Sequence, residues 1–299
     1  MGLRSARGAR VAAGRTVALL AVAAVTLAGC TSNGADDDGS PSASPSPSAT
    51  TSSPDVTTTP TAEPGTVEAA VYFPVDTRAG FRLARETRSL DEADAGVSAL
   101  ETMIAGPEDP DYTTPWDPGT QVLSVEVSDD VVTVDLSEEA RTANVGSELA
   151  ALMVQQLVWT VTSALATDLP VQLLIDGEPA GELWGTLVWD EPVARADAAD
   201  TLVLVQIDSP TQGETVASPV TVSGQANAFE ANVPWRVLDQ DGEVVEEGFT
   251  MTSEGQTFAP FSFTVELEPG QYTVEISEDD PSDGAAGEPM TDSRQFVVP

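Results

Sequence analysis

The sequence predicts two folded domains behind an unstructured leader: an α+β domain with one sheet and two helices over residues 66–190, and an all-β sandwich over residues 201–299. In the first domain, short alternating apolar runs are interrupted by two stretches with the period of an amphipathic helix. After residue 200 only alternating runs remain, at near-regular spacing, which is typical of a β-sandwich. Residues 31–65 contain almost no large apolar side chains and are predicted to be disordered.

The first 29 residues have the parts of a secretory signal: four arginines, an apolar run over residues 17–27 and then small residues. This run is too short to cross a bilayer core, which needs roughly 20 residues. The only cysteine, Cys30, closes the sequence Leu27-Ala28-Gly29-Cys30, which resembles the lipobox of bacterial lipoproteins. The resemblance implies cleavage before Cys30, a diacylglycerol on its thiol and an N-acyl lipid. The protein would then be anchored to the outer face of the cytoplasmic membrane.

Residues 30–65 follow this cysteine and are rich in Ser, Thr and Pro. A segment of this composition cannot bury an apolar core, so it is expected to be a flexible tether between the lipid and the folded domains.

The charge balance excludes several classes of function. The chain has 49 acidic residues, 12 arginines and no lysine, which gives a net charge of −37 and disfavours nucleic acid as a partner. It also contains no histidine, the commonest general base and a ligand in nearly all catalytic zinc sites. We therefore expect a protein that is not an enzyme and has no cofactor besides its covalent lipid.

The first domain is predicted to have the order strand-strand-helix-strand-strand-helix-strand. The first helix is expected to begin at Asp91 with an acidic first turn and to stop at Gly106-Pro107. The predicted elements are strands 67–73 and 81–90, helix 91–105, strands 121–127 and 131–136, helix 147–166 and strand 171–175.

Several local stretches of this domain resemble the GerMN domain of bacterial spore-germination and cell-envelope proteins. They occur in the order of that family and together span roughly residues 67–190. The matching stretches are Val71-Tyr72-Phe73-Pro74, Thr87-Arg88-Ser89-Leu90, residues 99–107, residues 131–137, residues 156–162 and residues 171–179. The resemblance implies an extracytoplasmic interaction or scaffolding module without established catalytic residues.

Residues 191–200 are polar and small and are interpreted as a connector. Trp235 and Tyr272 are expected to pack in the core of the sandwich that follows, with Tyr272 placed as a tyrosine corner. The predicted strands are 202–207, 216–223, 233–239, 243–251, 258–267, 271–277 and 294–298.

This half of the chain resembles the immunoglobulin-like domain of bacterial spore germination, over roughly residues 201–299. The resemblance rests on Ile207-Asp208-Ser209-Pro210, residues 220–226, Phe261-Ser262-Phe263 and Tyr272-Thr273-Val274. It implies binding or assembly, and the order of the two domains supports both resemblances.

Four arginines, Arg78, Arg82, Arg85 and Arg88, lie within eleven residues of an otherwise acidic chain. In an extended strand, Arg82 and Arg88 share a face with Glu86, and Arg85 lies opposite. Arg82, Arg85 and Arg88 are therefore candidates for contact with an anion or a partner, and the favoured alternative is pairing with local carboxylates.

An acidic loop between the last two predicted strands contains Asp279, Asp280 and Asp283. These carboxylates form a weak candidate Ca²⁺ site, but their spacing fits no EF-hand and a solvated loop is the simpler interpretation.

The function we expect is a membrane-anchored binding or scaffolding module of the cell envelope. The lipid would attach it to the membrane, and its partner would be an unknown envelope protein or a cell-wall polymer. Two alternatives stay open: a carboxylate-dependent hydrolase of envelope polymers, and a weakly Ca²⁺-responsive adhesion module.

Overall fold

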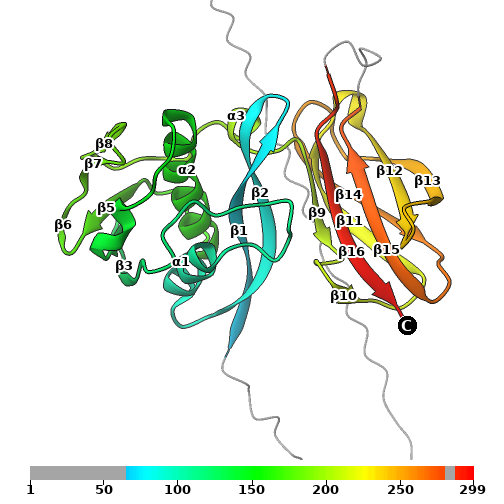
Figure 1. Ribbon diagram of the computed structural model, residues 1–299, viewed down its shortest axis with the longest axis horizontal. Helices are drawn as coiled ribbons and strands as arrows, with labels where there is room; N and C mark the ends of the chain where they lie inside the picture. The colour runs from blue at the N-terminus through cyan, green and yellow to red at the C-terminus, as the bar shows by residue number, and fades with distance from the viewer. Residues whose placement is uncertain (1–64, 280–286) are drawn as a thin grey trace, which may run out of the picture. The chain divides into compact units, whose positions relative to one another are not determined.

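The computed structural model describes residues 65–279 and 287–299, all of which belong to one compact unit of the chain (Figure 1). The signal segment, Cys30, the linker up to residue 64, Asp280 and Asp283 lie outside the described residues. Within the described ranges, no helix combines the length and apolar character needed to cross a bilayer.

The first domain opens with an antiparallel hairpin of β1 (Thr66–Thr77) and β2 (Gly80–Asp91), paired along their whole length. This confirms the predicted hairpin and lengthens both strands. Because side chains alternate between the two faces of a strand, Val71, Phe73 and Ala84 share one face and are buried in the larger of the hydrophobic cores.

Two helices, α1 (Ala95–Ala105) and α2 (Ser147–Ala164), lie between this hairpin and a second sheet (Figure 1). The prediction for the start of α1 was wrong: the helix begins four residues later than Asp91 and has no acidic residue in its first turn. Asp91 instead ends β2, and its carboxylate accepts a hydrogen bond from the N–H of Ala93 at 2.9 Å. This local bond forms a turn, which is an alternative to helix for the backbone at this point.

The second sheet has four strands in the order β3-β4-β5-β6, with β4 and β5 parallel. Its first three strands agree with the predicted positions. The bounds are β3 Val122–Val127, β4 Val132–Leu136, β5 Val171–Ile175 and β6 Glu178–Pro179. Val134, Leu173 and Leu157 of α2 are fully buried between the sheet and the helices.

Several short elements were not predicted, because each is too brief to show a period. Residue Val193, in the segment interpreted as a connector, pairs with Val171, and Arg195 lies 4.6 Å above the ring of Trp159. The short elements are the 3₁₀ helices η1 (Glu138–Arg141) and η2 (Phe229–Ala231), strands β7 (Gly181–Leu183), β8 (Leu187–Trp189) and β10 (Glu214–Thr215), and helix α3 (Ala198–Thr201).

The second domain is a β-sandwich, as predicted. One sheet has the order β10-β16-β15-β12-β13 and the other β14-β11-β9. The strands are β9 Val205–Ser209, β11 Val220–Asn227, β12 Asn232–Asp239, β13 Val244–Met251, β14 Phe258–Val265, β15 Gly270–Ser277 and β16 Thr291–Val298. Each matches one of the seven predicted runs, and their inward side chains form a core of their own.

The two aromatic residues singled out in the sequence both pack in the sandwich. The Tyr272 hydroxyl donates to the carbonyl of Glu268 at 2.9 Å, which is the hydrogen bond of a tyrosine corner. Trp235 is only partly buried, near the sheet edge, where its ring stacks on Phe263 with centroids 4.4 Å apart. Gly248 lies beneath it, where a Cβ would come within 2.7 Å of the indole.

Candidate functional site: a buried polar junction

The strongest concentration of buried charge joins the two domains. We call it the junction and define it by Glu86 of β2, Asp109 and Tyr112 of the loop after α1, and Asp292 and Arg294 of β16. All five residues are buried, and Arg294 is only 2% exposed. Since burying an unpaired charge is very costly, the partners of these groups decide what the junction can do.

Glu86 holds the loop after α1 in place. Its carboxylate accepts the backbone N–H of Asp109 at 2.7 Å and that of Glu108 at 3.0 Å, and it is paired with Arg88. The loop is closed on itself where Asp111 donates its N–H to the Asp109 carboxylate at 2.9 Å. The Asp109 side chain is thereby aimed at the sandwich.

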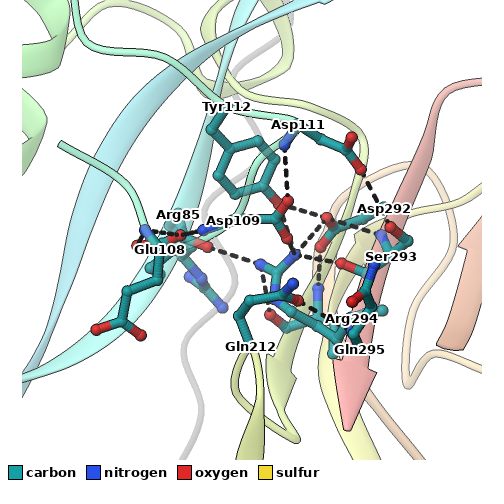
Figure 2. Close-up of polar contacts among 12 residues, drawn as sticks. Arg85, Glu108, Asp109, Asp111, Tyr112, Gln212, Asp292, Ser293, Arg294 and Gln295 are labelled. Carbon is teal, nitrogen blue, oxygen red and sulfur yellow. Dashed lines mark hydrogen bonds and ion pairs between the residues drawn. The ribbon is translucent and has the colours of Figure 1, made fainter. Parts of the chain in front are cut away.

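Arg294 is the centre of the junction. Figure 2 shows Asp109, Tyr112 and Asp292 converging on its guanidinium. Nη1 donates to Asp109 Oδ2, to the Tyr112 hydroxyl and to Asp292 Oδ1, each at 2.8 Å. Nη2 donates to the carbonyls of Arg85 at 3.2 Å and Ile207 at 3.3 Å. One planar group therefore binds both domains at once.

Asp292 completes the network from the other side. It accepts the N–H of Ile207 at 2.6 Å and a hydrogen bond from the Tyr112 hydroxyl. The guanidinium also lies 5.2 Å from the centroid of the Tyr112 ring, a cation–π distance. The junction thus combines ionic, hydrogen-bonded and aromatic contacts across residues 180 positions apart in the chain.

Burial sets the electrostatics of the junction. Burial, reinforced by the nearby carboxylates of Asp292 and Asp111, raises the pKa of Asp109 to about 6, although the Arg294 guanidinium and the N–H of Asp111 act against the rise. Burial also raises the pKa of Tyr112 well above its ordinary value. Burial alone would lower the pKa of Arg294, but the attraction of Asp292, Tyr112 and Asp109 outweighs it and raises that pKa. The guanidinium therefore stays charged.

A second ion pair lies beside the junction. Arg85 donates from Nε to Asp208 Oδ1 at 2.8 Å and from Nη2 to Oδ2 at 2.6 Å, a bidentate pair, and from Nη1 to Gln225 at 3.2 Å. Burial opposes the charge of Arg85, but the pairing with Asp208 prevails and raises its pKa. Asp208 belongs to β9, so this pair also connects the domains.

The structure gives the predicted arginines different surroundings. Arg85 reaches the sandwich, and Arg88 pairs with Glu86 on its own strand and with Glu108. Arg78 pairs with Glu278. The Nε of Arg82 is buried without a hydrogen-bond partner among the described residues.

Sequence reasoning missed Asp109, Tyr112, Asp292 and Arg294. One signal was available: Phe296 and Val298 alternate inward along the last strand, and the same alternation places Arg294 and Asp292 inward as well. A charged residue at an inward strand position needs a buried partner, but its identity cannot be read from local spacing.

The candidate calcium residues are only partly described. Asp279 is described, and Asp280 and Asp283 are not. The residues the structure does describe contain no group of three or more ligands suited to a metal ion. The calcium site stays a prediction.

Comparison with known families identifies both domains. Residues 70–181 match the Germane family model, described as sporulation and spore germination. Residues 204–285 match the Gmad2 model, described as the immunoglobulin-like domain of bacterial spore germination. The chain carries a Germane domain followed by a Gmad2 domain. None of the curated proteins is similar enough to count as a match.

Solved structures are also similar to part of this chain. Tandem GerMN domains of the sporulation protein GerM from Bacillus subtilis share 20% identity, with a TM-score of 0.38, over 51% of this chain and 50% of that one. The first GerMN domain of GerM shares 25%, with a TM-score of 0.35, over 44% of this chain and 99% of that one. A candidate lipoprotein from Clostridium perfringens shares 18%, with a TM-score of 0.33, over 46% and 94%. The chain thus spans half the length of the tandem GerMN structure.

The junction residues can be compared with the two matched ranges. Asp109 and Tyr112 belong to the Germane match, whereas Asp292 and Arg294 lie beyond the end of the Gmad2 match at residue 285. They are nevertheless part of the same sandwich, because β16 pairs with β15 along its whole length. The strand that closes the Gmad2 sheet also carries the residues that bind the Germane domain.

Proposed function

We propose that this protein is an extracytoplasmic lipoprotein that acts as a binding or scaffolding module in the cell envelope. The lipobox-like sequence before Cys30 supports an anchor on the outer face of the cytoplasmic membrane. The two domains, whose families are associated with sporulation and spore germination, support a role in envelope assembly. The linker would let them reach partners away from the membrane surface.

The observation that carries this proposal is the junction. Inter-domain contacts within a chain usually allow relative motion unless the interface is strongly held. Here the buried polar groups of the junction bond to one another across the domain boundary. Arg294 donates hydrogen bonds to Asp109, Tyr112 and Asp292. This arrangement favours one rigid body that presents surfaces from both domains in fixed register, as a scaffold requires.

The same contacts favour binding over catalysis. A general acid or base needs a titratable group that can reach a substrate. The shifted pKa values of Asp109 and Tyr112 arise inside the junction, where both groups are occupied by Arg294. Partners would include the membrane, through the lipid, and an envelope protein or cell-wall polymer, and the acidic charge disfavours nucleic acid.

The anchor is tested by replacing its thiol. The chain is expressed in a bacterium with lipoprotein processing and labelled with a radioactive fatty acid, and membranes are separated from soluble fractions. Wild type should carry label and sediment with membranes, whereas Cys30→Ala should lose the label and become soluble without a change in melting temperature. Thr31→Ala, one residue away, is the matched control. A Cys30→Ala chain that still sediments with membranes would refute the anchor.

The binding role is tested by photo-crosslinking in intact cells from sites on both domains. A reproducible set of envelope partners supports the proposal. Release of soluble fragments from purified peptidoglycan, abolished by replacing one acidic pair, would refute the non-catalytic interpretation.

A further inference from the structure

Strand β13 forms one edge of the five-stranded sheet, with β12 on one side. On its other side no strand pairs with it in the described part of the chain. The same part exposes eight large hydrophobic side chains, and four of them lie on this strand: Val244, Val245, Phe249 and Met251. Natural edge strands are normally short or protected by lysine or proline. β13 is eight residues long and contains neither, and its own charged residues are Glu246 and Glu247, beside a bulge at Val245.

The backbone of β13 is oriented to receive another strand. Phe249 stands opposite Pro234, and since proline has no N–H, these two residues cannot form a doubly hydrogen-bonded pair. The N–H and C=O of Phe249 therefore point away from β12. Alternation along the ladder gives Glu247 and Met251 the same outward direction. These are the groups that an added strand would use.

A groove of about 850 Å³ lies over one face of the same sheet, across β13, β12 and β15, with β13 at its rim. Pro234 and Phe249 supply apolar contact, and Phe249 is 70% exposed. Glu247, Glu275 and Glu288 line the same groove. The only cation among its lining residues is Arg236, whose guanidinium is paired with Glu275 at 2.7 Å. The groove therefore combines apolar side chains near β13 with an excess of negative charge.

We propose that β13 and this groove bind an extended, basic segment of a partner protein, which adds to the sheet as a further strand. This inference rests on the proposed binding role and names the class of partner. Main-chain hydrogen bonds to Glu247, Phe249 and Met251 hold the segment, and the side chains facing the groove select it. Since Glu247 and Phe249 lie on one face two residues apart, the segment carries a lysine or arginine beside Glu247 and an apolar residue beside Phe249.

A second copy of this chain fits the edge poorly. Two β13 strands paired edge to edge around a twofold axis would bring Glu246 and Glu247 of both copies close together, and like charges opposite each other are destabilising. The net charge of −37 adds a general repulsion between copies. A basic segment relieves both effects.

The test uses the full chain in detergent and a fluorescent ten-residue peptide with blocked ends and the repeat Lys-Thr-Val-Thr, which places lysine and valine two residues apart on one face. A peptide with glutamate at every lysine position is the matched probe. The basic peptide should bind, the acidic peptide should not, and affinity should fall as salt rises. Phe249→Pro removes an outward N–H, and Glu247→Lys reverses a groove charge. Each should weaken binding by roughly tenfold or more.

Val188→Pro is the control, because Val188 is another exposed apolar residue on a strand and lies in the first domain, away from β13. Its binding should equal that of wild type, and melting temperatures show whether each variant is folded. On binding, the amides of Glu247, Phe249 and Met251 should gain protection from hydrogen exchange.

Equal binding of both peptides, unchanged affinity in Phe249→Pro, or protection confined to other strands would overturn the inference. So would concentration-dependent dimerisation that Phe249→Pro abolishes, which would assign the edge to a second copy. Because the labelling and crosslinking experiments do not involve this peptide, a failure here leaves the anchored binding role standing.

Discussion

Replacing Arg294 with methionine tests whether the junction holds the two domains together. Methionine keeps much of the side-chain volume and removes every hydrogen bond that the guanidinium makes. Asp109 and Asp292 would then stay buried without their cation. Breaking a buried ion pair in this way costs about 3–5 kcal/mol of unfolding free energy. For a folded unit of this size, each kcal/mol lowers the melting temperature by roughly 2–4 °C. We therefore expect a loss of roughly 6–20 °C.

The assays at pH 7 are urea unfolding, which gives the free energy, and thermal unfolding, which gives the melting temperature, each followed by tryptophan fluorescence and by circular dichroism. Arg236→Met is the matched control, because Arg236 is also paired with a glutamate, at 2.7 Å, but its side chain is 49% exposed. An exposed pair contributes about 0–1 kcal/mol. Arg294→Met should also separate the unfolding of the two domains into two transitions. If both variants lost the same stability in one shared transition, the junction would not couple the domains.

Three further outcomes follow from the structure. The folded-state pKa of Asp109, about 6, lies above its ordinary 3.8, so protonation of this group favours the folded state at low pH and that contribution is lost as pH rises through about 6. Asp109→Asn should flatten the curve of unfolding free energy against pH between these values, by up to roughly 3 kcal/mol, and an unchanged curve would contradict the assignment. Tyr272→Phe removes the hydrogen bond to Glu268 and should cost about 1 kcal/mol in urea unfolding, with no effect on Germane-domain amide exchange. Gly224→Ala would place a Cβ 1.9 Å from the carbonyl oxygen of Gln206, so calorimetry should show a loss of roughly 2–3 kcal/mol of unfolding free energy. If the variant were as stable as wild type, β9 and β11 would have moved apart at this point at little cost, contrary to this expectation.

Much of the fold could be predicted because its elements carry strong local periods. The seven runs of the sandwich, the β1–β2 hairpin and α2 all show apolar residues at strand or helix spacing. The start of α1 was wrong because the acidic residues after Asp91 suit a helix N-terminus and a turn equally well. In the folded chain Asp91 is held by strand pairing and by the N–H of Ala93. Local composition could not separate the two.

The junction could not be predicted in the same way. Its hydrogen bonds connect Tyr112 to Asp292 and Asp109 to Arg294, and no local pattern links positions so far apart. The arginine cluster drew attention to β2, where Arg85 does contact the sandwich. Arg294, which donates to Asp109, Tyr112 and the carbonyl of Arg85 across the domain boundary, was only the first residue of a predicted strand.

The junction residues come from both halves of the chain, and the segment 191–200 joins those halves covalently. Because Val193 and Arg195 of this segment are themselves held on the first domain, the junction closes within one chain and without a search through solution. A protease cut within this segment would turn the same contacts into a bimolecular association. The two fragments would then behave as a heterodimer whose dissociation constant measures the strength of the junction directly.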